Sequence, residues 1–201
     1  RQMCIRDSSK IRGEVSISGS KNAALPILAA TLLFDKNVTI KNLPRVKDID
    51  TMLNLLKSLG RKITFKNNKK IATISKGKKN NFFAPYSLVK TMRAGILVLG
   101  PLLAKNKKAK VSSPGGCSIG VRPIDIHLKA ISKLGVKIKI EKGYVNATAQ
   151  EGLVGSEIRF SKISVGATEN SILAACLAEG ITTIKNCAIE PEIKDLTNFL
   201  K

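Results

Sequence analysis

The sequence repeats itself along the chain. Segment 124–138 (IDIHLKAISKLGVKI) resembles segment 49–63 (IDTMLNLLKSLGRKI), and a weaker third copy, IKDLTNFLK, occupies residues 193–201. The identical pairs include Ile49 and Ile124, Asp50 and Asp125, Leu59 and Leu134, Gly60 and Gly135, and Ile63 and Ile138. A repeat of this kind indicates that one supersecondary unit is used several times.

A second element repeats ahead of the first. Segments 25–42, 90–104 and 170–186 resemble one another, and each predicts an apolar helix leading into a short strand. An amphipathic helix follows, because apolar residues from Met52 to Leu59 have the spacing of one helix face and Gly60 suits the position after a helix end. Two strands joined by a polar turn complete the unit. The sequence therefore predicts an α/β fold of about three α-β-α-β-β units.

Both ends of the chain depart from this pattern. The third unit stops at Lys201, before the strands that should follow its second helix, which predicts that the chain is a piece of a longer protein. Residues 1–8 show no period and no capping pattern, so we expect a leader that is not native sequence. Segment 13–26 (GEVSISGSKNAALP) predicts a strand, a turn and the start of a helix.

The chain is strongly basic, with a formal net charge of +21. Its lysines are spread over the turns between periodic segments, and aromatic residues make up only 4% with no Trp. Platforms for base stacking are therefore poorly supplied, and nucleic-acid binding is not expected. Two interpretations stay open: a lysine-rich composition on exposed turns, or a basic cleft for a small anionic substrate.

The apolar runs indicate the compartment of the protein, and the spacing of the cysteines indicates whether it can hold zinc. The longest apolar run, 94–104, is too short to span a bilayer, and the first residues contain no apolar segment typical of a signal peptide. We therefore expect a cytoplasmic protein without membrane partners. Four cysteines without a C-x-x-C pair make a zinc site unexpected, and Cys176, in an apolar helical stretch, is expected in the core.

Two polar stretches stand where apolar helices begin. Lys21 and Asn22 follow a Gly/Ser turn, and Arg93 comes early in the apolar segment of the second unit. Helix starts attract anions, and a nearby lysine adds a point charge suited to phosphate or carboxylate. The alternatives are a solvated lysine beside a helix cap and, for Arg93, an internal salt bridge.

The segment SSPGGCSIGVRP, residues 112–123, combines a glycine pair with a cysteine and an arginine. Cys117 is expected near a helix start and the guanidinium of Arg122, and both favour a thiolate. A reactive cysteine and a small residue in a turn both remain open. His127 is either near this site or on the surface. Because repeated units converge, we expect Lys21, Arg93, Arg122 and Cys117 to share one cleft.

Five stretches in this order resemble the UDP-N-acetylglucosamine 1-carboxyvinyltransferases, the enolpyruvyl transferases of peptidoglycan synthesis. They are ISGSKNAALPIL, APYSLVKTMRAGI, PGGCSIGVRPIDIHL, KISVGAT and EPEIKDL, within residues 10–201. The resemblance implies an inside-out α/β barrel of two lobes, each built from three related units. It also implies transfer of the enolpyruvyl group of phosphoenolpyruvate to the 3'-hydroxyl of UDP-N-acetylglucosamine, with release of phosphate and without metal or organic cofactor.

The resemblance further implies roles for individual residues. Cys117 is implied as the general acid that fosfomycin alkylates, with Lys21 and Arg122 as its catalytic partners. Lys21, Asn22, Arg122 and Cys117 are implied to hold phosphoenolpyruvate. The residues implied to contact UDP-N-acetylglucosamine are Asn22, Arg93, Arg122, Pro123, Ile124, Asp125, Ile126, Lys162, Ile163, Ser164 and Val165.

The resemblance also divides the chain. Residues 9–20 are implied to be a strand of the second lobe, and 21–201 an incomplete first lobe. The catalytic base is implied to lie in the second lobe, so the chain alone is expected to lack turnover. The alternatives are a shikimate-pathway enolpyruvyl transferase, which lacks the Pro-Gly-Gly-Cys loop, a basic RNA-binding or RNA-end-processing protein of similar fold, and a non-catalytic lobe that binds UDP-sugars.

Overall fold

The computed structural model describes residues 12–68, 70–113 and 124–201. The helices are α1 (Lys21–Ala30), α2 (Lys47–Ser58), α3 (Tyr86–Val89), α4 (Leu99–Asn106), α5 (Asp125–Ser132), α6 (Val165–Ala175) and α7 (Pro191–Leu200), with 3-10 helices η1 (Thr31–Leu33) and η2 (Arg93–Val98). The strands are β1 (Val38–Ile40), β2 (Arg61–Lys66), β3 (Ile71–Lys76), β4 (Phe83–Ala84), β5 (Lys108–Ser112), β6 (Lys137–Glu141), β7 (Tyr144–Thr148), β8 (Glu157–Arg159) and β9 (Thr183–Lys185). The expected leader, 1–8, lies outside the described residues.

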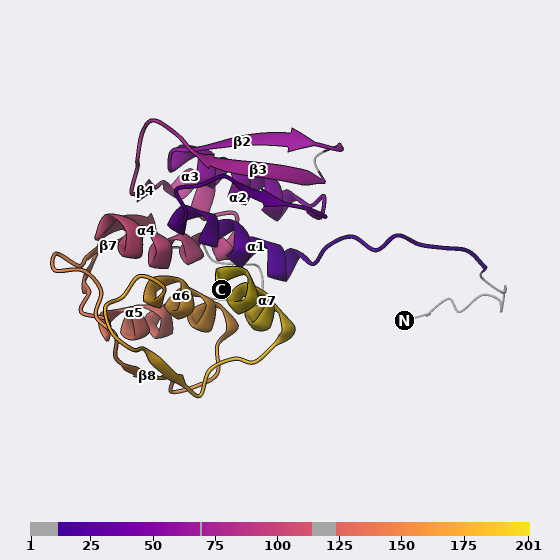
Figure 1. Cartoon of the computed structure of the whole chain (residues 1–201). Helices are drawn as coiled ribbons and strands as arrows, with labels where there is room; N and C mark the ends of the chain where they lie inside the picture. Colours follow the sequence, from indigo (N-terminus) through magenta and orange to yellow (C-terminus); the bar gives the residue numbers. More distant parts are fainter. Residues whose placement is uncertain (1–11, 69, 114–123) are drawn as a thin grey trace, which may run out of the picture.

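The strand order confirms the predicted repeat. The first sheet has the order β1-β3-β2, and the second, β4-β5-β7-β6, contains the equivalent order β5-β7-β6. In each, an antiparallel hairpin, β2–β3 or β6–β7, pairs through its second strand with the strand that follows the apolar helix. The third unit contributes α6, β9 and α7 in the same sequence as α1, β1 and α2. Figure 1 shows the helices gathered against these sheets.

The structure adds a strand that the sequence did not predict ahead of the first helix of two units. β4 pairs in parallel with β5, and β8 pairs in parallel with β9. Residues 12–20 hold the corresponding place in the first unit, but the described residues give them no strand partner. Val15 and Ile17 are about 85% exposed there, and Figure 1 shows this segment extending away from the body of the molecule.

The single helix predicted over 90–104 is divided in the structure. Met92 is extended, with φ −140° and ψ 113°, and separates α3 from η2, which leads into α4. The interruption brings Gly95 against α3, where a Cβ would lie 3.0 Å from Val89 Cγ1. Arg93 therefore begins a new helical segment, so its position at a helix start holds although the helix is shorter than predicted.

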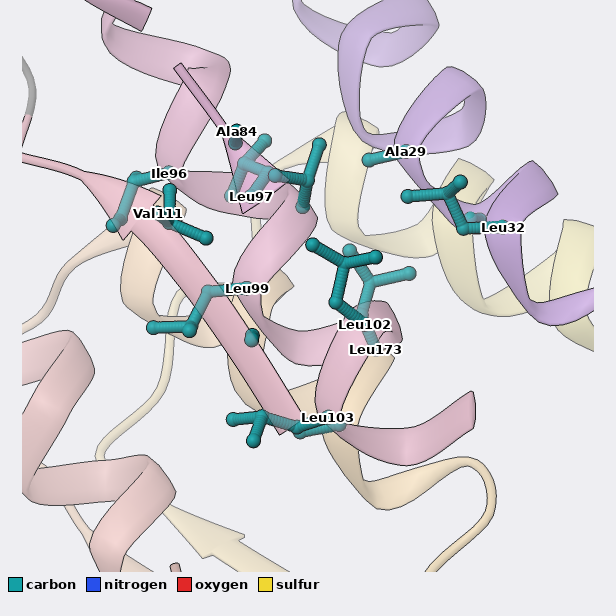
Figure 2. Close-up of a cluster of buried hydrophobic side chains, with 14 of the residues drawn as sticks. Ala29, Leu32, Ala84, Ile96, Leu97, Leu99, Leu102, Leu103, Val111 and Leu173 are labelled. Carbon is teal, nitrogen blue, oxygen red and sulfur yellow. The ribbon is translucent and has the colours of Figure 1, made fainter. Parts of the chain in front are cut away.

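The apolar helices of the three units form a common core. Figure 2 shows Ala29 and Leu32 of the first unit facing Leu97 and Leu102 of the second, with Leu173 of α6 beside them. All five side chains are buried. Burying a leucine contributes about 1.5–3 kcal/mol relative to leaving it exposed, so this shared core fixes the three helix starts relative to one another.

Cys176 is exposed rather than part of this core, so that prediction is wrong. α6 ends at Ala175, and Cys176 is the residue that caps its C-terminus. The apolar pattern of the segment continues beyond the helix, but the chain turns toward β9 at this point and the helical face that would bury the thiol ends.

Candidate active site

A pocket of about 780 Å³ opens where helix starts from all three units meet. The first unit contributes the start of α1, the second the start of η2 and part of α5, and the third the start of α6. Polar and charged side chains converge there from segments far apart in the sequence. Those lining the pocket are Lys21, Asn22, Asp48, Arg93, His127, Lys162, Ser164, Glu169 and Glu192.

The α1 side of the pocket is a capped helix start. Ser20 Oγ accepts a hydrogen bond from the Ala23 N–H at 3.4 Å, and Lys21 and Asn22 follow directly. Lys21 Nζ lies 3.0 Å from Asp48 Oδ2, in the first turn of α2. The remaining free N–H groups of the first turn and the helix dipole favour an anion at this position.

The α6 side repeats this arrangement. Ser164 Oγ accepts from the Ala167 N–H at 3.4 Å, and Lys162 and Ile163 approach the pocket on the segment before the helix. Val165 and Gly166 form the first turn of α6, where backbone N–H groups lack intrahelical partners. The third unit therefore offers a second helix start with a cation beside it.

Arg93 brings a third cation, from the start of η2. Lys21, Arg93 and Lys162 thus come from three different repeats and line one pocket. Such a concentration of positive charge, in a concave site between two helix starts, suits a ligand with several anionic groups.

A buried carboxyl group lines the same pocket. Glu169 on α6 is only 5% exposed, and burial raises its pKa to about 8, with Glu192 and Glu190 adding to the effect. The group is therefore mostly protonated at neutral pH. It adds little negative charge to the pocket and can donate a hydrogen bond.

His127 also lines the pocket. Of the two positions that the sequence left open, near the site or on the surface, the structure supports the one near the site. His127 is buried on α5, at 4% exposure. Burial, reinforced by the charge of Arg93 and opposed by Asp125, lowers its pKa to about 4. The imidazole is therefore neutral over the physiological range.

The structure brings most of the predicted site residues together. Those that line the pocket are Lys21, Asn22, Arg93, Ile126, Lys162, Ile163, Ser164 and Val165. Ile124 and Asp125 stand at the start of α5, next to Ile126, but do not line it. Cys117, Arg122 and Pro123 lie outside the described residues.

Sequence reasoning missed several pocket residues. Glu169 and Asn170 belong to a polar run, 168–171, inside a helix that is apolar on either side of it, and a carboxyl group at that place was a usable signal. His127 shares a helical face with Ala130, Ile131 and Leu134, all buried, so its spacing indicated an inward direction. Glu192 of α7 carried no signal, because only the packing of α7 places it beside the pocket.

Comparison with known proteins agrees with this architecture. Residues 5–201 match the family described as EPSP synthase (3-phosphoshikimate 1-carboxyvinyltransferase). The chain belongs to this family. Among curated proteins it is 67% identical, over 193 residues, to the UDP-N-acetylglucosamine 1-carboxyvinyltransferase of Pelagibacter ubique, covering 96% of this chain and 46% of the relative. The protein of the same name from Helicobacter pylori is 55% identical over 191 residues, covering 95% and 45%.

Solved structures of the family confirm the predicted α/β fold. The enolpyruvyl transferase NikO from Streptomyces tendae superposes with a TM-score of 0.78 at 20% identity, over 91% of this chain and 42% of that one. EPSP synthase from Acinetobacter baumannii gives 0.72 at 19% identity, over 90% and 42%. The chain thus spans a little under half the length of the relatives and structures that it matches.

Neither a metal centre nor a membrane span is found in the described part of the chain. Residues 12–68, 70–113 and 124–201 contain no cluster of three or more His, Cys, Asp or Glu side chains able to hold a metal ion. None of the helices described there is long and apolar enough to cross a bilayer.

Proposed function

We propose that this chain supplies one lobe of an enolpyruvyl transferase that acts on UDP-N-acetylglucosamine. The reaction transfers the enolpyruvyl group of phosphoenolpyruvate to the 3'-hydroxyl of the sugar and releases phosphate, the first committed step of peptidoglycan synthesis. The observation that carries the proposal is the convergence of Lys21, Arg93 and Lys162 on one pocket, because two anionic substrates need several cations. Relatives at 51–67% identity bear the name of this enzyme.

The two helix starts suit the two substrates. Lys21 and Asn22, at the start of α1, hold the phosphate or carboxylate of phosphoenolpyruvate together with Arg122. Arg93 and the segment around α6 hold the nucleotide sugar. The residues proposed for this second substrate are Asn22, Arg93, Arg122, Pro123, Ile124, Asp125, Ile126, Lys162, Ile163, Ser164 and Val165.

The proposed reaction proceeds by addition to phosphoenolpyruvate and then elimination of phosphate, and each step needs a proton transfer. The 3'-hydroxyl gives up its proton to the catalytic base as its oxygen forms a bond to C2 of phosphoenolpyruvate, and the electron pair of the C2–C3 double bond takes a proton at C3. The tetrahedral intermediate then expels phosphate from C2 and returns a proton from C3. By resemblance we assign the proton that C3 takes to Cys117 as general acid, with Lys21 and Arg122 stabilising the charge that develops on phosphoenolpyruvate.

A second lobe completes the enzyme in this proposal and supplies the catalytic base. The chain spans 46% of the length of its Pelagibacter relative, which leaves room for a lobe of similar size. Residues 9–20 act as a strand of that lobe. The outward-facing Val15 and Ile17 support this assignment, because an extended segment with two exposed apolar side chains suits pairing with another sheet.

The other candidate functions are less favoured. Shikimate-pathway activity agrees with the family description, but the curated relatives at more than 50% identity carry the UDP-sugar name. The net charge of +21 alone does not favour RNA binding or RNA-end processing over small anionic substrates, because the pocket that Lys21, Arg93 and Lys162 line contains no Phe, Tyr or Trp side chain on which a base could stack. We also propose that the enzyme acts in the cytoplasm, where both substrates of such a reaction are made.

The test is to join this chain to the second half of the Pelagibacter ubique relative and measure phosphate release. We expect release that requires both phosphoenolpyruvate and UDP-N-acetylglucosamine, and none with shikimate 3-phosphate as acceptor. The reverse acceptor preference overturns the proposed substrate. Absence of release with either acceptor, from a folded protein, overturns the proposed activity.

The role of Cys117 has a separate test. In the same extended protein, fosfomycin is expected to add one equivalent when UDP-N-acetylglucosamine is present, as read by intact mass. The Cys117→Ser variant is the matched control and should remain unlabelled. Equal labelling of both proteins removes Cys117 from the mechanism without affecting the substrate assignment.

A further inference from the structure

Four lysines form a two-by-two array on the solvent side of the second sheet. Lys108 and Lys110 lie two residues apart on β5, and β6 carries Lys137 and Lys139 with the same spacing. The strand between them is β7, where Thr148 is the register partner of both Lys108 and Lys137. The lysines are therefore about 7 Å apart along each strand and about 10 Å apart across β7. We call these four residues the lysine face.

The strand alternation turns the lysine face away from the core. Ala109 and Val111, which alternate with the two lysines of β5, are buried, whereas all four lysines are exposed. In the part of the chain that the structure describes, no ion pair involves any of the four. Glu141 is the one acidic residue of the four strands of this sheet. The lysine face therefore carries positive charge that its own sheet does not neutralise.

The equivalent sheet of the first unit lacks such an array. The repeat aligns Lys62 of β2 with Lys137 of β6. The next outward residue is Thr64 on β2 but Lys139 on β6. The exposed residue of β1, the strand equivalent to β5, is Thr39. The fold itself therefore does not require lysines at these positions, and the second sheet differs from the first in the charge that it presents to solvent.

Aromatic side chains border the lysine face, and ammonium groups cover them. Lys110 Nζ lies 5.2 Å from the centroid of the Tyr144 ring and 5.6 Å from that of Phe83. Lys108 Nζ lies 4.3 Å from the centroid of the Phe82 ring. Stacking of nucleic-acid bases needs open ring faces. The surface therefore presents charges rather than a stacking platform, which disfavours a single-stranded nucleic acid as its ligand.

The residue types also disfavour a specific acidic site on a protein. Arginine binds individual carboxylates and phosphates through its bidentate fork, and β4, β5, β6 and β7 contain no arginine. Lysine ammonium groups are compact, hydrated point charges. Neither the active-site pocket nor the smaller pocket beside α5 includes any of the four lysines. An open array of point charges complements an extended surface of negative charge, as anionic lipid headgroups provide.

We propose that the lysine face binds the surface of membranes that contain anionic phospholipids. The contact is peripheral and reversible, because each lysine close to such a surface strengthens binding by only about fivefold. It needs no spanning segment, so the sequence prediction of no membrane partner, which rested on the apolar runs, does not bear on it. It is also separate from the proposed reaction, since none of the four lysines lines the active-site pocket.

The test is flotation with lipid vesicles of this chain joined to the second half of the Pelagibacter ubique relative. We expect binding to vesicles of phosphatidylcholine with phosphatidylglycerol, none to phosphatidylcholine alone, and weakening as salt rises from about 0.05 to about 0.3 M. The double variant Lys137→Gln/Lys139→Gln is expected to lower the partition coefficient by about 25-fold. The matched control is Lys62→Gln/Lys66→Gln, which removes two exposed charges from the equivalent strand β2 and should stay within about threefold of wild type.

The outcomes that overturn the proposal are distinct. Equal binding to both kinds of vesicle, or equal losses in the two double variants, removes the lysine face from the interaction. Binding of a labelled oligothymidylate that depends on Lys137 and Lys139, without vesicle binding, assigns the face to nucleic acid. A loss of stability in urea for K137Q/K139Q alone, without vesicle binding, places the second lobe on the face. Phosphate release from the proposed substrates should be unchanged in both double variants, which keeps this test independent of the proposed function.

Discussion

Lys21 Nζ and Asp48 Oδ2 are 3.0 Å apart, so a cation proposed to bind substrate is paired with a carboxylate of the same pocket. Both side chains are partly exposed, at 46% and 37%. Exposed ion pairs contribute between about 0 and 1 kcal/mol. Asp48 therefore holds Lys21 in place without binding it strongly, and an anionic substrate competes with it for the same ammonium group.

The variant Asp48→Asn is expected to tighten the binding of phosphoenolpyruvate. Removing the competing charge frees Lys21 and makes the potential of the pocket more positive, which corresponds to a gain in affinity of up to about fivefold for 1 kcal/mol. The dissociation constant is measured by titration calorimetry in the extended protein, with the free energy of unfolding expected to change by less than about 1 kcal/mol.

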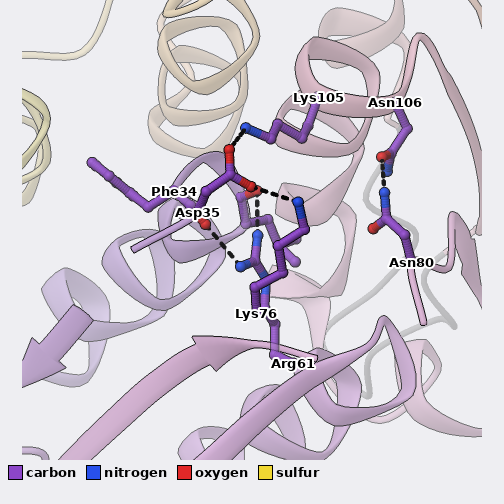
Figure 3. A network of polar contacts seen from close by, with 8 residues as sticks. Phe34, Asp35, Arg61, Lys76, Asn80, Lys105 and Asn106 are labelled. Carbon is purple, nitrogen blue, oxygen red and sulfur yellow. Dashed lines mark hydrogen bonds and ion pairs between the residues drawn. The ribbon is translucent and has the colours of Figure 1, made fainter. Parts of the chain in front are cut away.

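Asp35→Asn is the matched control for Asp48→Asn. Asp35 also pairs with lysines, at 2.9 Å to Lys76 and 2.6 Å to Lys105, but it does not line the pocket. Figure 3 shows Lys76 and Lys105 both reaching Asp35, which follows η1 beyond the C-terminal end of α1. If both variants change the affinity equally, a general charge effect explains the result and the local competition is refuted.

Arg61 is expected to matter more for stability than the ion pairs beside it. Its guanidinium donates to the carbonyl oxygens of Phe34 at 2.8 Å and of Leu32 at 2.6 Å, at the end of η1 (Figure 3). Arg61→Met leaves both carbonyl groups without this donor, which predicts a loss of about 1–3 kcal/mol in the free energy of unfolding.

Urea unfolding with Lys76→Met as the control checks this prediction. Lys76 contacts Asp35 on the surface, so its loss is expected to change stability by less than about 1 kcal/mol. Equal losses in the two variants would show that the two carbonyl contacts of Arg61 contribute no more than a surface charge.

Sequence periodicity predicted the repeating units because each helix face and hairpin is encoded within about fifteen residues. β4 and β8, and with them the parallel pairing of β4 with β5 and of β8 with β9, were missed. Two or three residues carry too little alternation to be recognised and, unlike β1 and β9, these strands lie outside the repeated segments. The cations were found because they stand at helix starts. The helical spacing of His127 and the polar position of Glu169 were usable signals, whereas the place of Glu192 beside the pocket depends on the packing of α7, which no local pattern determines.

Gly100 is expected to be among the least tolerant positions of the core. A Cβ there would lie 2.5 Å from the backbone oxygen of Asn170 and 2.7 Å from its Oδ1, where α4 crosses α6. Gly100→Ala must therefore separate the two helices and disturb the hydrogen bonds that the Asn170 side chain makes with the backbone of Gly100 and Ile96. We expect the free energy of unfolding, measured by thermal or urea unfolding, to fall by about 3 kcal/mol or more. This loss lies at or above the upper end of the usual range for a single substitution.

Gly143→Ala is the matched control for Gly100→Ala. Gly143 has a φ of +76° in the β6–β7 turn, but nothing lies within 4 Å of an added Cβ. Its cost is limited to the strain of a left-handed backbone, about 1–2 kcal/mol. A smaller loss in G100A than in G143A would contradict the close crossing of α4 and α6.

The raised pKa of Glu169 is expected to make the folded chain less stable as pH rises toward 8. The folded pKa of about 8 exceeds the ordinary value of 4.5 because of burial and the neighbouring Glu192 and Glu190. Between these two values the folded chain holds a proton that the unfolded chain has lost, so stability falls as pH rises. The slope for one group is about 1.4 kcal/mol per pH unit, and it ends above pH 8. Glu169→Gln removes the titration and keeps the volume.

The measurement is urea unfolding of wild type and Glu169→Gln at pH 6, 7 and 8. The stability advantage of the variant is expected to grow across this range. Glu157→Gln is the control, because Glu157 is exposed and Lys185 lowers its pKa, so its charge is constant above pH 6. Parallel curves for wild type and E169Q would mean that Glu169 is already ionised in the folded chain, which its burial between α6 and α7 argues against.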